Sequence, residues 1–395
     1  MQSKIDSALD GFVDQLFSQR RHAAVVGPRG GAIVSDPVTA DDILRAPDLF
    51  RKPTSLFWAL GRNRFNSNGA EWQQRRDLTQ RSYLQAGKRE NRTRVAEAYG
   101  RWLSNCGAAR PADIMQALFA ASTEIFCDAL GCPLAAEPML AFLSPVRELL
   151  KRVQYFSLVP PSVSERSTLE QDARSLLQDY RREMERFSAL RALIDHLQAQ
   201  GQAQIDGFDA VEELVMNAFA GVESTVATLG IAIERLGAHQ AVQEELARET
   251  AEGDAHPRLE CFIREVQRCY PSVPFIARQV ASQTEIEGQP MQPGAVIIIS
   301  IVGVHRHPDY WVDADSFDCA RSELVQNTYD RRAFIPFASG ARVCGGARLA
   351  QLELSEALKA FIRRFAVGPG DDEISFDYAM AIRPKSWDRI KIARR

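Results

Sequence analysis

Apolar residues recur at helical spacing along most of this chain, which predicts a mainly helical protein. In residues 5–17 they form one stripe interrupted by charged residues, the pattern of an amphipathic helix. Residues 211–236, 259–269 and 347–362 repeat their apolar positions with a period of about 3.6. We therefore predict a helix in each of these four segments.

Shorter apolar runs near the two ends of the chain predict a few strands. Residues 23–26 and 32–35 flank a Gly-Pro-Arg-Gly-Gly turn, as the two strands of a hairpin do. Further short strands are expected at residues 275–280 and 296–299, and a strand-rich piece at residues 374–392. The predicted fold class is therefore α+β, mainly α with small β-sheets.

The distribution of proline and glycine favours a single folded unit. Both are dispersed, with no low-complexity tract and no internal repeat. A chain of 395 residues is long enough for two domains, but no linker divides it. We predict one domain over residues 1–395, with a strand-containing N-terminal part at about residues 20–50 and a helical bulk.

Charge and cysteine usage exclude several classes of protein. The 48 basic residues are spread among 51 acidic ones and the net charge is -3, so nucleic acid is not an expected partner. Seven cysteines at irregular spacing indicate reduced thiols, which favours a cytoplasmic location. The longest strongly apolar run, residues 295–304, is about half the length of a spanning helix. The N-terminus reads as neither a signal peptide nor an anchor, and we expect no membrane span.

The most specific chemistry lies between Phe337 and Gly346, where Phe, Gly, Arg, Cys and Gly stand at fixed spacing. Cys344 sits in a glycine-rich loop at the mouth of the helix predicted for residues 347–362. Backbone N–H groups and the helix dipole there stabilise a thiolate, and Phe337 would keep water from the sulfur. A buried free cysteine is the alternative. The surrounding pattern favours an axial thiolate ligand to haem iron, with Arg342 reaching a haem propionate.

This loop resembles the haem-binding signature of the cytochrome P450 family, and three further stretches extend the resemblance over most of the chain. The resemblance implies that Cys344 binds the iron of haem b and that Gly346 belongs to the cofactor site. It also implies the family fold, in which haem lies between a long distal helix and the proximal helix after the cysteine loop.

Glu265 and Arg268 stand at i, i+3 and share one face of a predicted helix. On pattern alone such a pair is usually a solvated salt bridge. Its place before the cysteine loop resembles the internal Glu-x-x-Arg pair of the family. The resemblance implies that this pair locks a helix to the segment preceding Cys344, with Arg321 as its third member.

The segment Ala220-Gly221-Val222-Glu223-Ser224-Thr225 places weak helix formers in the middle of a long helix. A polar helix face with a small residue packed against a neighbour would explain it. The segment also resembles the oxygen-activation helix of the family. By that resemblance Gly221 lies over the haem, Glu223 is the catalytic acid and Ser224 the alcohol, with Thr225 as a second candidate hydroxyl.

Trp72 and Arg76 stand at i, i+4 on a predicted helix, which is also the pattern of an arginine-rich surface helix. The pair resembles the family's early helix, whose side chains bind a haem propionate. Arg278, at the end of a proline-stiffened segment, is a second propionate candidate by resemblance. Together with Arg342, these arginines would suit a dianionic cofactor in an apolar pocket.

The resemblance also implies a mostly apolar substrate pocket, which fits a lipophilic small molecule. Arg62 or Arg64 could meet a substrate carboxylate, but we favour their interpretation as surface arginines. The expected pocket residues are Phe57, Trp58, Phe219, Ala220, Val273, Phe275, Ile276 and Met380.

The activity implied is that of a monooxygenase using dioxygen. Electrons are expected from a separate ferredoxin or similar donor with its reductase, so that NAD(P)H is used only indirectly. The expected basic docking face comprises Arg342, Arg348, Arg363 and Arg364, which would otherwise be ordinary solvated arginines. A peroxide-driven peroxygenase and a haem-binding protein without turnover are the competing interpretations.

Overall fold

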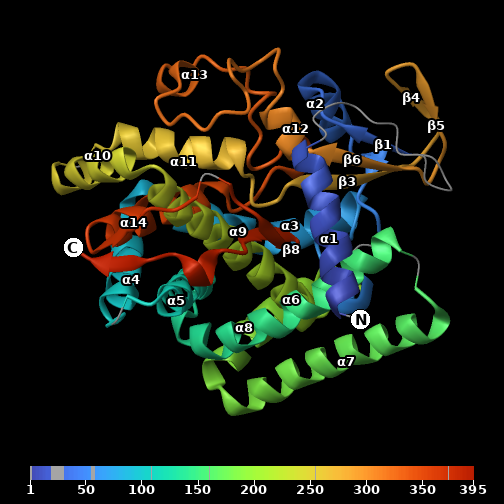
Figure 1. Ribbon diagram of the computed structural model, residues 1–395. Coiled ribbons are helices and arrows are strands. Elements are labelled where there is room, and N and C mark those ends of the chain that lie inside the picture. Colours follow the sequence, from blue (N-terminus) through green and yellow to red (C-terminus); the bar gives the residue numbers. More distant parts are fainter. Residues whose placement is uncertain are drawn as a thin grey trace.

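A computed structural model describes residues 2–18, 31–54, 58–107, 109–159, 161–253, 255–371 and 373–395. Long helices make up most of this structure, and a small sheet lies to one side of them (Figure 1). The strand predicted at residues 23–26, the first four residues of the Gly-Pro-Arg-Gly-Gly turn and the pocket residue Phe57 lie outside the described residues.

The helices fall into three groups along the chain. The first group comprises α1 (Gln2–Ser18), α2 (Pro37–Arg45), α3 (Gly69–Ala86), α4 (Arg92–Ser104) and α5 (Pro111–Ala129). The second comprises α6 (Ala136–Leu158), α7 (Val163–Arg186), α8 (Ser188–Gln202), α9 (Ala210–Ala238), α10 (Gln240–Ala251) and α11 (Pro257–Cys269). The third comprises α12 (Ile301–His305), α13 (Ser322–Val325) and α14 (Ala347–Ile362).

A four-stranded sheet joins the N-terminal part of the chain to the segment that follows α11. Its order is β1-β6-β3-β2, with β1 parallel to β6 and the other two pairs antiparallel. Its strands are β1 (Gly31–Val34), β2 (Phe50–Arg51), β3 (Phe275–Val280) and β6 (Val296–Ser300). Three two-stranded pieces complete the β-structure: β4 (Thr284–Ile286) with β5 (Gln289–Met291), β7 (Phe365–Val367) with β10 (Ile392–Arg394), and β8 (Phe376–Ala379) with β9 (Ala381–Pro384).

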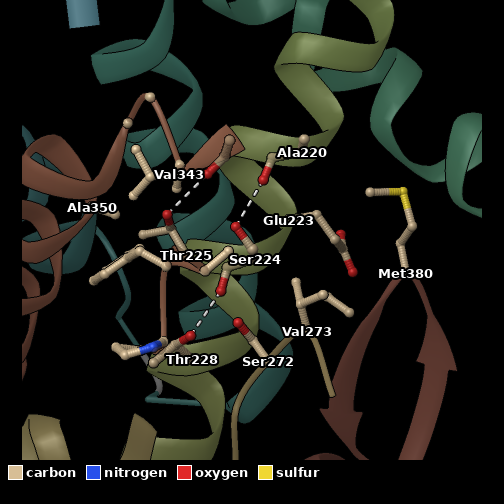
Figure 2. Close-up of a pocket in the computed structure, with 18 of the residues that line it drawn as sticks. Ala220, Glu223, Ser224, Thr225, Thr228, Ser272, Val273, Val343, Ala350 and Met380 are labelled. Atoms are coloured by element: carbon tan, nitrogen blue, oxygen red, sulfur yellow. Dashed lines mark hydrogen bonds between the residues drawn. The ribbon is translucent and has the colours of Figure 1, made fainter. Parts of the chain in front are cut away.

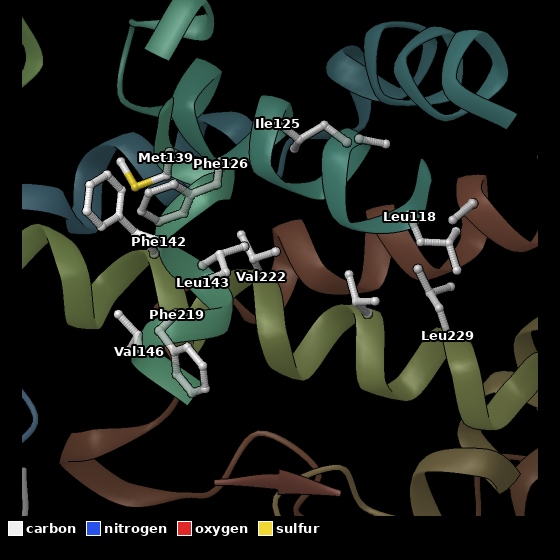
Figure 3. Packing of buried hydrophobic residues seen from close by; sticks show 14 of the residues in the cluster. Leu118, Ile125, Phe126, Met139, Phe142, Leu143, Val146, Phe219, Val222 and Leu229 are labelled. Carbon is white, nitrogen blue, oxygen red and sulfur yellow. The ribbon is translucent and has the colours of Figure 1, made fainter. Parts of the chain in front are cut away.

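Helix α9 runs through the middle of the molecule (Figure 1). It begins at Asp209, whose side chain accepts hydrogen bonds from the backbone N–H groups of Val211 (2.9 Å) and Glu212 (3.3 Å) and so caps the helix. Its apolar side chains interdigitate with those of α5 and α6, as Figure 3 shows for Val222 and Phe219. This packing matches the segment predicted from periodicity at residues 211–236.

By length and composition α9 would also suit a membrane span. However, 83% of its most apolar window is buried inside the protein. A core position accounts for that composition, since a helix that is apolar all round is buried in the interior of a large protein.

Glu265, Arg268 and Arg321 form a buried lock between α11 and the loop that follows α12. The Glu265 carboxylate accepts two hydrogen bonds of 2.7 Å from the Arg268 guanidinium and one of 3.3 Å from Arg321 Nε. Arg268 also donates to the carbonyl oxygens of Ala314 and Ser316. All of the charges are therefore satisfied internally, which is the condition under which such a buried cluster is tolerated.

Candidate functional site

A cavity of about 320 Å³ lies where segments far apart in the sequence meet. Its walls are formed by α3, α9, the start of β3, residues 335–346, the first half of α14 and the tip of the β8–β9 hairpin. Figure 2 shows part of this wall, with the side chains of α9 on one side and Met380 of the hairpin on the other.

Cys344 reaches this cavity from a tight loop. Its backbone N–H donates to the Phe337 carbonyl oxygen (2.9 Å), which closes the loop. Gly340 has a φ of 71°, and a Cβ atom there would collide with the Leu44 carbonyl oxygen, so the turn requires glycine. Burial raises the pKa of the Cys344 thiol, while the Gly346 backbone N–H and Arg64 oppose that rise. The loop therefore presents one sulfur, supplied with stabilising donors, to the cavity.

Three cations, of which Arg278 is buried and the other two are half-buried, form another part of the wall. Arg342 donates to the Ser67 carbonyl oxygen (2.7 Å) and Asn68 Oδ1 (2.9 Å), and Arg278 donates to the Ala277 carbonyl oxygen (3.0 Å). The third is Lys52. Among the described residues, none of the three pairs with a carboxylate. The wall therefore carries several positive charges without a balancing anion.

The pKa values of all three cations are lowered, as expected for positive charges without a nearby anion. Burial lowers the pKa of Arg278 and that of Arg342 to about 10, and repulsion between the two adds to the effect on Arg278. Burial and both arginines hold the pKa of Lys52 well below its ordinary value. An anionic group bound in the cavity would relieve this strain, and a haem with two propionates beside a thiolate ligand fits the residues present.

The two residues predicted on α3 as propionate contacts lie at different distances from the cavity. Trp72 lines the cavity, and the Arg342 guanidinium lies over its ring at 4.4 Å. Arg76 does not line the cavity; its guanidinium lies 5.6 Å from the centre of the Trp72 ring. The i, i+4 spacing placed both residues on one helix face, but Trp72 itself occupies the position closest to the cavity.

Arg64, which the sequence suggested to be a surface arginine, belongs to the cavity wall. Its guanidinium donates to Thr79 Oγ1 (3.0 Å) and Asn217 Oδ1 (3.4 Å), which hold it inside the protein. Lys52 was also missed. Both residues lie in irregular segments, where no local periodicity indicates which way a side chain faces.

Hydroxyl groups follow the cavity side of α9. Ser224 Oγ donates to the Ala220 carbonyl oxygen (2.7 Å), Thr225 Oγ1 to that of Gly221 (2.9 Å) and Thr228 Oγ1 to that of Ser224 (2.9 Å). Figure 2 shows these side chains along one stretch of the helix. A Cβ atom on Gly221 would lie 3.3 Å from the Phe126 ring, so a larger residue there would press on that ring.

Glu223 lines the same cavity but is held in ion pairs. Its carboxylate, only 1% exposed, pairs with Arg147 of α6 and with Arg383 of β9, whose Nε lies 2.7 Å from Oε1. Arg147 also pairs with Asp377 (2.6 Å). In Figure 2 the Glu223 side chain turns toward Met380 and away from the hydroxyl groups. Any role of Glu223 as a proton donor would require these pairs to open.

Glu353 is a second carboxyl on the cavity wall, and sequence reasoning missed it. It accepts hydrogen bonds from Tyr99 Oη (2.9 Å) and Ser122 Oγ (2.8 Å) and is 4% exposed. Burial raises the pKa of Glu353 to about 7, and the two hydroxyl donors oppose that rise. A signal was present, because Glu353 interrupts the apolar face of the helix predicted at residues 347–362.

The predicted pocket residues divide between the cavity and other surfaces. Phe275 packs edge-on against Phe12, and Trp58 lies under the Arg166 guanidinium at 4.7 Å, so neither lines the cavity. Strand alternation explains Phe275, since Ile276 and Arg278 share the opposite face of β3. The predicted pocket residues that do line the cavity are Phe219, Ala220, Val273, Ile276 and Met380.

Comparison with known proteins shows which protein family this sequence matches. Residues 25–389 match the family model of the cytochrome P450 proteins. "Probable cytochrome P450 4ac1" of Drosophila melanogaster is 30% identical over 227 residues, which are 53% of this chain and 44% of that protein. "Putative cytochrome P450 138" of Mycobacterium tuberculosis is 35% identical over 190 residues, or 47% and 42%. The matches thus span less than half the length of these curated relatives.

Solved structures share the fold over nearly the whole chain. CYP175A1 from Thermus thermophillus superposes with a TM-score of 0.77 at 20% identity, covering 96% of this chain and 94% of that one. A six-coordinated cytochrome P450 from Thermus thermophilus gives 0.75 at 20% identity, covering 95% and 96%. At this identity the likeness concerns the fold.

Proposed function

Because the chain belongs to the cytochrome P450 family, we propose that it is a haem-thiolate monooxygenase that oxidises a lipophilic small molecule with dioxygen. One observation carries the proposal. Cys344 opens into the same cavity as the hydroxyl groups of α9 and three cations that lack a carboxylate partner among the described residues. That combination provides an iron ligand, a polar distal face and counter-charges for propionates.

The residues that would hold haem b are distributed around the cavity. Cys344 would bind the iron, and Lys52, Arg278 and Arg342 would neutralise the propionates, with Trp72 packed beside Arg342. When bound, haem supplies one-electron and oxygen chemistry, and a thiolate ligand favours cleavage of the O–O bond. Gly346 leaves open space where a side chain would otherwise reach into the cavity.

The hydroxyl groups of α9 would organise water opposite Cys344. Ser224 and Thr225 each donate their hydroxyl hydrogen to the helix backbone, so their oxygen lone pairs stay available to accept from water. Glu223, held by Arg147 and Arg383, lines this side of the cavity. In this proposal α9 orients the water molecules beside it and limits how many of them enter. The ion pairs of Glu223 oppose a role of its carboxyl as a proton donor.

The substrate would bind against the apolar part of the cavity. Phe126, Phe219, Val273 and Ile276 present aromatic and aliphatic surface there, and Met380 closes the side formed by the β8–β9 hairpin. The Met380 backbone N–H donates to Gln154 Oε1 (3.1 Å), which ties the hairpin tip to α6. This lining favours a lipophilic molecule.

Electrons would come from a separate donor such as a ferredoxin with its reductase, NAD(P)H being used only indirectly. A docking face near the cysteine loop would rely on Arg348, which is exposed, more than on Arg342, which faces the cavity. Arg363 donates to the Thr250 carbonyl oxygen (2.8 Å), and Arg364 to Ser104 Oγ (3.1 Å). We infer a cytoplasmic enzyme, in keeping with such a soluble partner.

The ferrous protein treated with carbon monoxide provides the direct test. A haem-thiolate site should absorb at about 450 nm, and the variant Cys344→Ser should lose this band. Cys319→Ser is a matched control that should keep it, since that thiol lies outside the cavity. A wild-type band at about 420 nm in folded protein would contradict the thiolate assignment.

Turnover separates the proposal from its alternatives. Substrate oxidation should require a reductant, an electron-donor protein and dioxygen. Rapid oxidation driven by hydrogen peroxide alone would favour a peroxygenase. A normal carbon monoxide band without any oxidation across a broad panel of fatty acids, terpenes, aromatics and polyketides would favour a haem-binding protein.

A further inference from the structure

Glu353 is enclosed between three helices without a cationic partner among the described residues. It projects from α14 and accepts hydrogen bonds from Tyr99 of α4 and Ser122 of α5, both of them uncharged donors. It lines the same cavity as Cys344, which lies nine positions earlier in the chain. No ion pair in the described part of the chain includes this carboxyl.

Several charged groups on the elements around Glu353 are engaged in ion pairs with other groups. These pairs are Arg92 and Lys359 with Glu356 (α4 and α14), Arg75 with Glu213 (α3 and α9), Arg268 with Glu265 (α11), Arg147 and Arg383 with Glu223 (α9), and Arg395 with Glu244 (α10). Burial raises the pKa values of Tyr83 and Tyr99, and it lowers that of His256 beyond Lys359, so these groups stay neutral at neutral pH. Lys52, whose pKa is lowered, remains as a second titratable group on the cavity wall.

A carboxyl in this setting responds to any change of charge in the cavity. Burial holds the pKa of Glu353 at about 7, so near neutral pH its charged and neutral forms have similar free energies. An electron added to a cofactor in the same low-dielectric space repels the carboxylate form and raises the affinity of the carboxyl for a proton. By linkage, a proton on the carboxyl makes the electron easier to add.

We propose that Glu353 takes up one proton from solvent when the cofactor of the proposed haem-thiolate site is reduced. The electron would come from an external one-electron donor and be held by the haem that Cys344 would bind, while the proton from solvent converts the Glu353 carboxylate to a carboxylic acid. The inference rests on the proposed function. Glu353 acts through the electrostatic field of the cavity and is a positioning residue, which sets the reduction potential without touching the reacting atoms.

The midpoint reduction potential of the haem-loaded protein, measured by spectroelectrochemistry between about pH 5.5 and 8.5, tests this proposal. The wild-type potential should fall as pH rises, with a slope no steeper than about 59 mV for each tenfold change in proton activity. In Glu353→Gln the potential should be independent of pH and lie near the low-pH limit of the wild type, because glutamine is a neutral isostere of the protonated acid.

Two further variants identify the group that titrates. Ser122→Ala removes a donor that stabilises the carboxylate, so the pH-dependent window should move to higher pH without disappearing. Lys52→Met should keep the slope. A wild-type slope retained in Glu353→Gln, or a slope lost only in Lys52→Met, would overturn the inference.

The carbon monoxide complex of the ferrous protein distinguishes a failure of this inference from a failure of the proposed function. Glu353→Gln and Ser122→Ala should both show the band at about 450 nm, which reports a folded haem-thiolate site. A normal band with an unchanged slope in Glu353→Gln overturns the inference alone. Absence of the band from the wild-type protein overturns the proposed site, and the inference falls with it.

Discussion

Two carboxyl groups line one cavity, and their surroundings give them opposite electrostatic character. Glu223 and Glu353 are both almost fully buried, at 1% and 4% exposure. Glu223 lies between Arg147 and Arg383 and forms an ion pair with each of them. Glu353 meets only hydroxyl groups among the described residues, so burial raises its pKa to about 7. At a similar depth of burial, the two carboxyls differ in the number of cations beside them, and nearby charges are one of the factors that set the proton affinity of a carboxyl.

The Glu223 region should be the more costly of the two to disturb. Glu223→Gln leaves Arg147 and Arg383 with one anion fewer in a buried site, and we expect a loss of about 3–5 kcal/mol in the free energy of unfolding. Urea denaturation of the haem-loaded protein at neutral pH measures this loss.

A surface pair provides the matched control. Arg182 pairs with Asp179 one turn earlier on α7, where both side chains are exposed, and Arg182→Gln should cost less than about 1 kcal/mol. Equal losses in the two variants would show that the buried ion pairs contribute no more than a solvated one.

Replacing Glu353 should change the free energy of unfolding in the opposite direction. A carboxyl whose folded-state pKa is raised from 4.5 to about 7 lowers stability as pH rises through that window, because the folded state holds the proton more tightly. Glu353→Gln should therefore become more stable than the wild type as pH increases, by up to about 3 kcal/mol above pH 7. Unfolding curves at several pH values measure the difference, and a pH-independent difference would contradict it.

The variant Tyr99→Phe should have the smallest effect on stability, and it tests the hydrogen bonds of Glu353. It removes one hydroxyl donor from Glu353 and should cost about 1–2 kcal/mol at pH 8, where the acceptor is charged. At pH 5, where the carboxyl is neutral, the cost should be smaller. A loss that is the same at both pH values would indicate that only the packing of the ring is affected.

Local sequence was a good guide wherever the information lies in neighbouring residues. The helix predicted at residues 347–362 is α14, and the segment at residues 211–236 is α9 with one or two residues added at each end. The cysteine loop was also identifiable, because its glycines, arginine and cysteine are contiguous. The pairing of Glu265 with Arg268 followed from their i, i+3 spacing on one helix.

The direction of side chains in irregular segments was harder to predict from the sequence. Arg64 and Lys52 face the cavity, whereas Arg76, Trp58 and Phe275 do not line it. Each outcome depends on how a loop or a strand edge approaches α9 and α14. Helical spacing and strand alternation order the side chains within an element, but they leave open which face of that element meets the cavity.

The sequence by itself determined the family resemblance, the main helices and the cysteine that faces the cavity, because these depend on short-range spacing and on residue chemistry. Only the tertiary structure decided which partners lie beside the two cavity carboxyls. Arg383 reaches Glu223 across 160 positions, and Tyr99 reaches Glu353 across 254. A carboxyl takes its proton affinity from the partners that surround it, and those partners are brought together only when the chain folds.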